Sequence, residues 1–219
     1  MLAKIILKEG PGLPLVFLHG FLGTAADWKP VVSHLPPCEC IGFDLPGHGG
    51  SPFVESFEIG VPRFHLIGYS MGGRLAMMYA AKHREQVASL ILMSTHPGLQ
   101  TEQERESRRK NDAEWAKLIF ELPIDEFLFR WYNQPLFHGF KPDLEMRKKQ
   151  NVEALAKSLI HYSLAGQPRF ESEGILVGEW DEKFKNVCKN PVVIPRAGHA
   201  VHLENPLAVA NTIIQRIRL

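Results

Sequence analysis

"HLIGYSMGGRLAMMYA", residues 65–80, joins a short apolar run to a stretch whose apolar residues have helical spacing. The junction, residues 68–72, matches the pattern G-x-S-x-G with Ser70 at its centre. Glycines beside the serine allow the backbone a sharp turn that lifts the hydroxyl clear of a sheet. The stretch therefore predicts a strand, a turn that presents Ser70 as a nucleophile, and a helix. An ordinary strand-to-helix turn is the alternative.

Apolar runs like the first recur along the chain, each bounded by glycine or proline. They are continuous rather than alternating in polarity, as is typical of strands buried on both faces. Helical patterns lie at 72–83 and at 204–217. This alternation predicts an α/β fold with a mostly parallel central sheet flanked by helices. The runs are "LPLVFLHG" (13–20), "CECIGFDLPG" (38–47), "RFHLIGYS" (63–70), "VASLILMS" (87–94), "GILVGEWD" (174–181) and "PVVIPRAGH" (191–199).

The stretch from about 97 to 165 interrupts this rhythm, because it has helical periodicity and no convincing strand. We expect it to form a helical cap inserted within a single domain that spans residues 1–219. Residues 101–150 contain ten Lys or Arg and ten Asp or Glu, so the segment is highly charged yet neutral. A solvated helical surface is the simplest interpretation, and single arginines turned inward are the functional one.

The composition favours chemistry on a small molecule. With 25 basic and 24 acidic residues, the net charge of +1 gives no reason to expect nucleic acid or an anionic membrane as a partner. No apolar run approaches the length of a membrane span. The three cysteines have neither zinc-site nor redox spacing, which favours buried thiols in a reducing cytoplasm. We expect a cytoplasmic protein without a metal or organic cofactor.

A serine nucleophile needs a base within hydrogen-bond reach and a carboxylate that orients the base, and in this architecture they follow in the order Ser, acid, His. Asp181 follows the run "ILVGEW", and His199 follows Gly198 in "PRAGHAVHLENP". Glu179 is the rival acid and His202 the rival base. We prefer His199, because His202 lies closer to the final helix and is placed to cap or pack there.

An oxyanion hole needs two backbone N–H groups directed at one point. In this architecture, the residue after the serine and an early loop supply them, which points to Met71 and Phe21. His19, in the same early loop, is expected to be structural rather than catalytic.

These residues also carry a family resemblance. "FLHGF", "DLPGHGGS", "GYSMGGR" and "AGHAVHLENP" resemble the α/β-hydrolase superfamily and imply the α/β-hydrolase fold. More narrowly, "GYSMGGRLAMMYA", "HPGLQ", "WYNQPLF", "SLAGQP", "GEWDEKF" and "IPRAGHAVHLENP" resemble the 2-succinyl-6-hydroxy-2,4-cyclohexadiene-1-carboxylate synthases of menaquinone biosynthesis. This likeness extends over nearly the whole chain.

The resemblance implies a lyase rather than a hydrolase. The family eliminates pyruvate from 2-succinyl-5-enolpyruvyl-6-hydroxy-3-cyclohexene-1-carboxylate, with the triad serine as base on a ring proton. The family's site maps here onto three sets of residues: the triad Ser70, Asp181 and His199; the carboxylate-binding arginines Arg74, Arg108 and Arg147; and the site aromatics Tyr69 and Trp131. The substrate it implies is a small polycarboxylate, bound by a monomer or a small homo-oligomer.

Arginines suit such a substrate, because the planar guanidinium pairs with carboxylates. A buried guanidinium without a partner is costly, so an esterase for neutral esters has no use for three of them. For each arginine, a surface salt bridge is the alternative interpretation. Two other functions stay open: a carboxylesterase or carbon–carbon bond hydrolase for a small acidic substrate, and a non-catalytic binding module.

One departure from the superfamily pattern lies at residues 52–63. Only "PFVESFEIGVPR" separates the "GHGGS" loop from the strand before Ser70, where the superfamily usually has a complete crossover helix. Parallel strands need a crossover of about a dozen residues or more. The chain is therefore either a compact member or a sequence that lacks loop residues.

Overall fold

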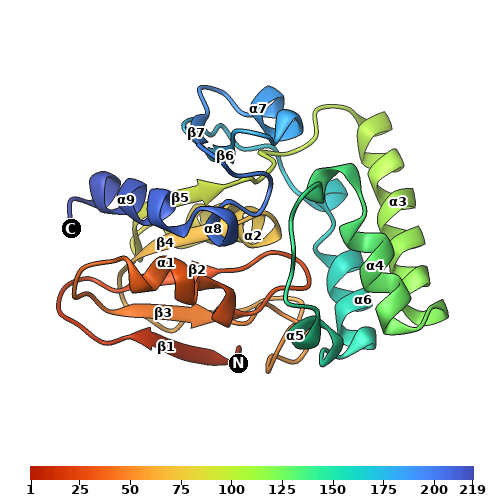
Figure 1. Cartoon of the computed structure of the whole chain (residues 1–219), viewed down its shortest axis with the longest axis horizontal. Coiled ribbons are helices and arrows are strands. Elements are labelled where there is room, and N and C mark those ends of the chain that lie inside the picture. Colours follow the sequence, from red (N-terminus) through yellow and green to blue (C-terminus); the bar gives the residue numbers. More distant parts are fainter.

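The computed structural model describes residues 1–219. A seven-stranded sheet forms its centre, with the strand order β1-β3-β2-β4-β5-β6-β7 (Figure 1). Only β1 is antiparallel to its neighbour, so the predicted mostly parallel sheet is confirmed. The strands are β1 (Lys4–Lys8), β2 (Leu15–Leu18), β3 (Cys40–Phe43), β4 (Phe64–Tyr69), β5 (Val87–Met93), β6 (Leu176–Gly178) and β7 (Val192–Ile194).

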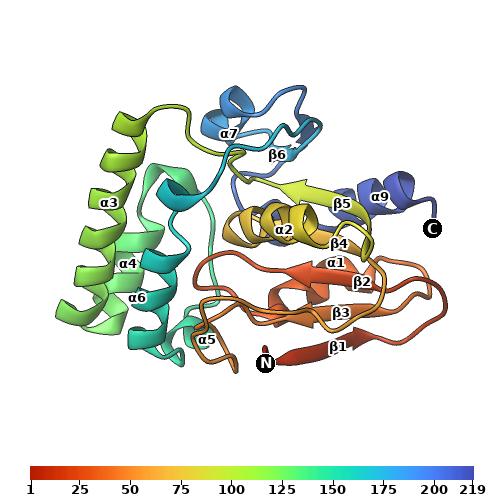
Figure 2. The ribbon, with the colours of Figure 1, turned by 180° about the vertical axis from the view of Figure 1, so that it is seen from behind.

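Helices cover both faces of the sheet (Figures 1 and 2). Helix α2 (Met71–Lys82) lies on one face, and α1 (Lys29–Ser33) and α9 (Pro206–Ile217) lie on the other. Alternate residues of β2 divide between two cores: Val16 and Leu18 pack on the α2 side, Leu15 and Phe17 on the α1 and α9 side. Burial on both faces explains why the strands read as continuous apolar runs. Shorter helices are η1 (Ala25–Trp28), α7 (Glu182–Val187) and α8 (Val201–Glu204).

Strand β1 is an element that the apolar-run criterion missed. It is an edge strand that pairs with β3, and its first three residues are exposed. Two lysines, Lys4 and Lys8, begin and end it. Its apolar run, Ile5 to Leu7, is only three residues long and lies between the two lysines, so it is shorter than the runs of the central strands β2 and β5.

The crossover from β3 to β4 contains no helix. Residues 52–63 form bends and irregular chain without a helix or strand, so the short crossover is compact in this structure. Ile59 and Val61 of this segment are buried in the core on the α2 side, and Phe53, Val54 and Phe57 pack against that core. A loop with apolar side chains therefore fills space beside α2 that a crossover helix usually covers.

Four helices between β5 and β6 stand together beside the sheet (Figure 1). They lie in the range 97–165 for which the sequence predicts a cap. Their own core includes Ile119, Phe127, Leu155 and Leu159, and Leu22 from the loop after β2 inserts into it. The helices are α3 (Glu102–Glu121), α4 (Ile124–Tyr132), α5 (Leu144–Lys148) and α6 (Val152–His161), with short turns η2 (Pro135–Phe137) and η3 (Leu164–Gly166).

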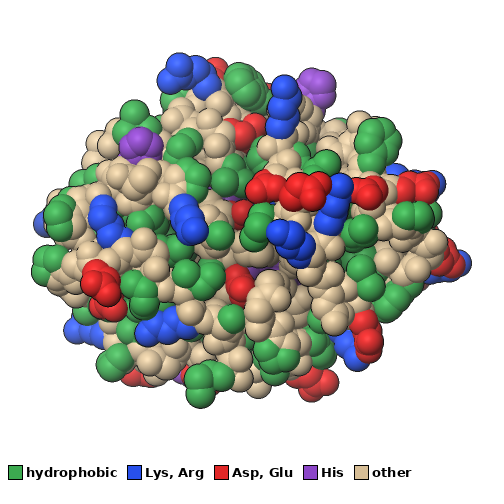
Figure 3. Space-filling model, turned by 60° about the horizontal axis from the view of Figure 1, so that its bottom comes forward, with side chains coloured by type: hydrophobic (Ala, Val, Ile, Leu, Met, Phe, Trp, Pro, Cys, Tyr) green, Lys and Arg blue, Asp and Glu red, His purple; other side chains and the backbone are tan.

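The surface agrees with the balanced composition. On the face shown in Figure 3, basic and acidic side chains are interspersed and do not form one large area of a single sign. Many of the exposed charges on the cap helices form pairs three or four residues apart, such as Lys157 with Glu153. No helix is long and apolar enough to cross a bilayer.

Asp44, buried at the end of β3, ties two loops to the sheet. Its carboxylate accepts hydrogen bonds from the N–H groups of Ala25 (2.7 Å) and Gly50 (2.8 Å). We expect Asp44→Ala to lower the free energy of unfolding by about 2–4 kcal/mol, because two N–H groups lose a charged acceptor. Urea unfolding measures this loss, with exposed Glu114→Ala as the control. An equal effect of both substitutions would contradict it.

Candidate active site

Ser70 occupies a strained turn between β4 and α2. Its φ is 51°, in the left-handed region that side chains with a Cβ rarely adopt. The turn is held by backbone hydrogen bonds from the N–H of Ser70 to Met93 (2.9 Å) and from the N–H of Arg74 to Ser70 (3.1 Å). Strain of this kind persists only where the surroundings fix it, and it concentrates at functional sites.

Glycines make this turn sterically possible. A Cβ on Gly72 would lie 2.3 Å from the carbonyl oxygen of His19. A Cβ on Gly68 would lie 2.7 Å from the carbonyl oxygen of Gly72. Both positions are therefore restricted to glycine, and the G-x-S-x-G pattern has a packing reason as well as a conformational one.

The structure brings Ser70, His199 and Asp181 into hydrogen-bond contact. The Nε2 atom of His199 lies 3.2 Å from the Oγ of Ser70, and its Nδ1 lies 2.7 Å from the Oδ2 of Asp181. The other carboxylate oxygen of Asp181 accepts the N–H of Phe184 at 3.1 Å, which fixes the acid at the start of α7. This chain of contacts is the geometry that a base-activated serine requires.

The two rival residues lie elsewhere. Glu179 accepts a hydrogen bond from the N–H of Arg196 at 2.8 Å and does not touch His199. His202 lies in α8 with its ring between those of Tyr69 (4.2 Å) and Trp28 (4.7 Å), and neither ring nitrogen has a hydrogen-bond partner. Burial lowers the pKa of His202 well below its usual value, so the ring is a neutral packing group.

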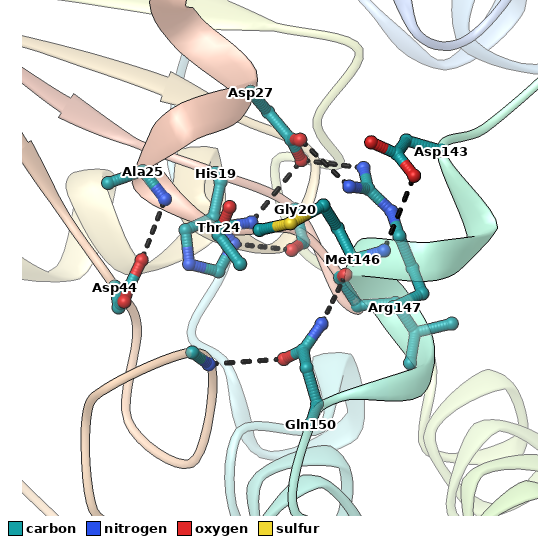
Figure 4. Close-up of polar contacts among 12 residues, drawn as sticks. His19, Gly20, Thr24, Ala25, Asp27, Asp44, Asp143, Met146, Arg147 and Gln150 are labelled. Atoms are coloured by element: carbon teal, nitrogen blue, oxygen red, sulfur yellow. Dashed lines mark hydrogen bonds and ion pairs between the residues drawn. The ribbon is translucent and has the colours of Figure 1, made fainter.

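Phe21 and Met71 line the same cleft as Ser70. Met71 begins α2, so its N–H has no acceptor within the helix. The N–H of Phe21 also donates to no backbone group. His19 supports this loop: its Nδ1 contacts the carbonyl oxygen of Gly20 at 2.7 Å (Figure 4), and its Nε2 accepts the N–H of Leu45 at 2.9 Å. Because burial lowers the pKa of His19 to about 3, it is neutral, in agreement with a structural part.

The three arginines all line the cleft but have different partners. Arg74 is 7% exposed, and its only hydrogen-bond acceptor is the carbonyl oxygen of Tyr162 at 2.7 Å. Burial, and then the positive charge of Arg108, lower its pKa to about 9, and no carboxylate contacts its guanidinium group. Arg74 thus carries a positive charge that the chain itself does not pair.

Arg108 and Arg147, in contrast, already pair with carboxylates of the chain. The Nε of Arg108 donates to both oxygens of Asp112 at 2.8 Å, four residues along α3. Arg147 donates to the two oxygens of Asp27 at 2.9 and 2.7 Å (Figure 4). The first pair is partly exposed and the second is buried, with Arg147 only 3% exposed. Both guanidinium groups thus face the cleft as members of ion pairs.

The aromatic residues expected at the site also line the cleft. The ring of buried Tyr69 lies 5.4 Å from that of His199. The indole of Trp131 lies 4.9 Å from the ring of Phe21, and its buried Nε1 has no partner. Trp131 of α4 and Tyr69 at the end of β4 thus form two parts of the cleft wall.

Three charged residues and one histidine of the cleft were not anticipated from the sequence: Asp27, Asp112, Lys183 and His96. Asp112 follows Arg108 by four residues, and this spacing on a helix is a signal that could have indicated the pair. Asp27 and Arg147 are far apart in sequence, so no local pattern connects them.

The cleft itself has a volume of about 170 Å³ and lies between the sheet and the helices α3 to α5.

Comparison with known proteins places this geometry in a family. The model of the alpha/beta hydrolase family matches residues 15–212. The 2-succinyl-6-hydroxy-2,4-cyclohexadiene-1-carboxylate synthase of Salmonella newport is 36% identical over 241 residues, covering 95% of this chain and 96% of the relative. The Enterobacter sp. enzyme of the same name is also 36% identical, with 95% of this chain and 93% of the relative covered.

Solved structures agree with the sequence comparison. MenH from S. aureus superimposes with a TM-score of 0.84 at 25% identity, covering 98% of this chain and 97% of the other. A thermophilic esterase from Thermogutta terrifontis, solved with malate bound, gives a TM-score of 0.73 at 26% identity over 99% and 93% of the two chains. The chain belongs to the α/β-hydrolase family and, within it, to the 2-succinyl-6-hydroxy-2,4-cyclohexadiene-1-carboxylate synthases.

Proposed function

We propose that this protein eliminates pyruvate from 2-succinyl-5-enolpyruvyl-6-hydroxy-3-cyclohexene-1-carboxylate, as a lyase of menaquinone biosynthesis. The observation that carries the proposal is Arg74. It is a buried cation without a carboxylate partner, one helical turn after Ser70 and in the same cleft. A cleft with such a group is suited to an anionic substrate, because a substrate carboxylate compensates the charge that the chain leaves unpaired.

The bond changes follow from the difference between substrate and product. Ser70, with its proton passed to His199, takes the proton from the ring carbon that bears the succinyl group. The released electron pair forms a new double bond in the ring, the existing double bond shifts by one position, and the carbon–oxygen bond to the enolpyruvyl group breaks. The leaving enolpyruvate takes up a proton and becomes pyruvate, and the ring becomes the 2,4-diene.

The remaining residues have supporting parts in this proposal. Loss of the ring proton places negative charge on the neighbouring succinyl carbonyl, and the N–H groups of Phe21 and Met71 are placed to stabilise it. Asp181 holds the imidazole of His199 in the orientation that Ser70 needs. The helices within 102–161 act as the cap of a single domain. A cytoplasmic location, the monomeric or small oligomeric state, and the absence of a cofactor stay predictions.

A second candidate is hydrolysis of a small acidic ester. It is favoured by the likeness to the malate-bound esterase, because that fold neighbour shows an acidic small molecule bound to a related chain. The two candidates use the same Ser70, His199 and Asp181, but they differ in whether Ser70 takes a proton or attacks a carbonyl carbon.

Pyruvate release distinguishes the candidates. We expect the purified protein to release one pyruvate per enolpyruvyl substrate consumed, as measured by coupling to lactate dehydrogenase. A folded protein that releases none, while it hydrolyses acidic aryl esters, would establish the second candidate instead.

Removal of the serine hydroxyl tests the catalytic proposal against a binding module. We expect Ser70→Ala to lower kcat at least about a thousandfold, because the triad acts as a unit. Circular dichroism and substrate binding by calorimetry serve as controls for folding. Unchanged turnover would remove Ser70 from the mechanism.

Removal of the unpaired cation tests the anionic substrate. We expect Arg74→Ala to lower kcat/KM for the polycarboxylate about tenfold to a hundredfold, since one charged hydrogen bond contributes about 1.5–3 kcal/mol. Hydrolysis of a neutral aryl ester should be nearly unchanged. Arg130→Ala, at an exposed arginine of α4 paired with Glu126, is the matched control. Equal losses on both substrates would show that Arg74 supports the fold instead.

A further inference from the structure

The charged side chains that line the cleft form two groups that differ in net charge. In one group, the carboxylate of Asp27 neutralises Arg147. In the other, Arg108 pairs with Asp112, whereas the cations Arg74 and Lys183 have no carboxylate partner. The first group is neutral and the second is positive. An anionic ligand is therefore attracted to the second group more strongly than to Arg147.

Lys183 is the member of the second group that neither the sequence nor the family resemblance indicated. It lies in the first turn of α7, two residues after Asp181, at the exposed rim of the cleft. Its Nζ lies 5.9 Å from the centre of the Phe184 ring, and that ring lies 4.8 Å from the ring of His199. The lysine side chain thus folds over a wall of the active site.

No acceptor within the chain holds the Lys183 ammonium group, which makes neither an ion pair nor a hydrogen bond. Its neighbour Lys185 differs, because its Nζ contacts Glu182 at 2.6 Å and the carbonyl oxygen of Glu179 at 2.7 Å. Asp181 lies near Lys183 but is bonded to His199 and to the N–H of Phe184. Loss of water at the cleft wall, and then the positive charge of Arg108, lower the pKa of Lys183.

His96 supplies a neutral donor beside this group. Its Nδ1 accepts the N–H of Gly98 at 3.0 Å, so the hydrogen of the neutral ring lies on Nε2, which has no acceptor in the chain. Burial lowers the pKa of His96 to about 4, with Lys183 as the next cause, and the ring is therefore neutral near pH 7. Its ring centre lies 6.5 Å from that of Phe184, the ring over which Lys183 folds.

We propose that Lys183, together with Arg74 and the Nε2–H of His96, forms a subsite for a carboxylate of the ligand. Lys183 is its specificity-determining member at the rim, and the ligand class is a small dicarboxylate or polycarboxylate. The proposal rests on the proposed function in one respect, namely that the natural ligand is anionic. It places the carboxylate beside α2 and α7 rather than on Arg147.

Succinate binding tests the subsite without turnover. Isothermal titration calorimetry is carried out on the unaltered protein, on two matched variants, Lys183→Met and Lys185→Met, and on Lys183→Arg, with succinamide as the uncharged probe. Methionine preserves the packing of the side-chain stem over Phe184 and removes the charge. We expect Lys183→Met to weaken succinate binding about three- to tenfold, a modest factor because the ammonium group is exposed to solvent. Lys185→Met should bind succinate as the unaltered protein does, and Lys183→Arg should restore most of the affinity.

Two kinds of result would contradict the proposed subsite. Equal affinities of Lys183→Met and Lys185→Met would show that Lys183 does not contact the anion. Absence of succinate binding to the unaltered protein, or equal binding of succinamide, would show that the cleft does not select a carboxylate. Because the assay needs no reaction, a protein that fails to release pyruvate but binds succinate through Lys183 would overturn the proposed function alone.

Discussion

The close approach of α2 to the loop after β2 is the constraint on which the rest of the cleft depends. At Gly72 a side chain would collide with the carbonyl oxygens of His19 and Leu18, at 2.3 and 2.5 Å. Because hydrogen alone fits there, the helix can begin directly after Ser70, and the serine is held at a positive φ. The same approach brings the N–H of Met71 and the N–H of Phe21 to one cleft. Serine, helix start and early loop thus form a single packed unit.

The cap is attached to this unit by polar contacts beside the early loop. Arg147 of α5 pairs with Asp27, and the side-chain amide of Gln150 donates to the carbonyl oxygen of Leu22 at 2.6 Å (Figure 4). Leu22 in turn inserts its side chain into the core of the cap helices. When one partner of a buried ion pair is removed, the other charge stays buried in the protein without a counter-charge, which is strongly destabilising. The pair of Arg147 and Asp27 therefore holds α5 against the early loop. The cap and the loop that carries Phe21 therefore hold each other in place.

The chain forms this fold and cleft with fewer residues than its relative has. The alignment with the Salmonella newport relative spans 241 residues although this chain has 219, so the relative carries residues that this chain lacks. The crossover at 52–63 is short and contains no helix. Its apolar side chains pack on the core beside α2, which keeps that face of the sheet covered without a crossover helix. None of residues 52–63 lines the cleft, so the short crossover leaves the cleft residues together.

The sequence by itself determined the elements whose cause is local. Continuous apolar runs indicated six of the seven strands, because a strand buried on both faces needs apolar side chains at successive positions. The glycines around Ser70 indicated the turn, because only a backbone without Cβ fits it. Tertiary structure decided what depends on residues distant along the chain. It paired the edge strand β1 with β3, and it gave Arg147 the partner Asp27. It also left Arg74 and Lys183 without carboxylates. A charge's partner is set by distance in space, and no local pattern in the sequence records that distance.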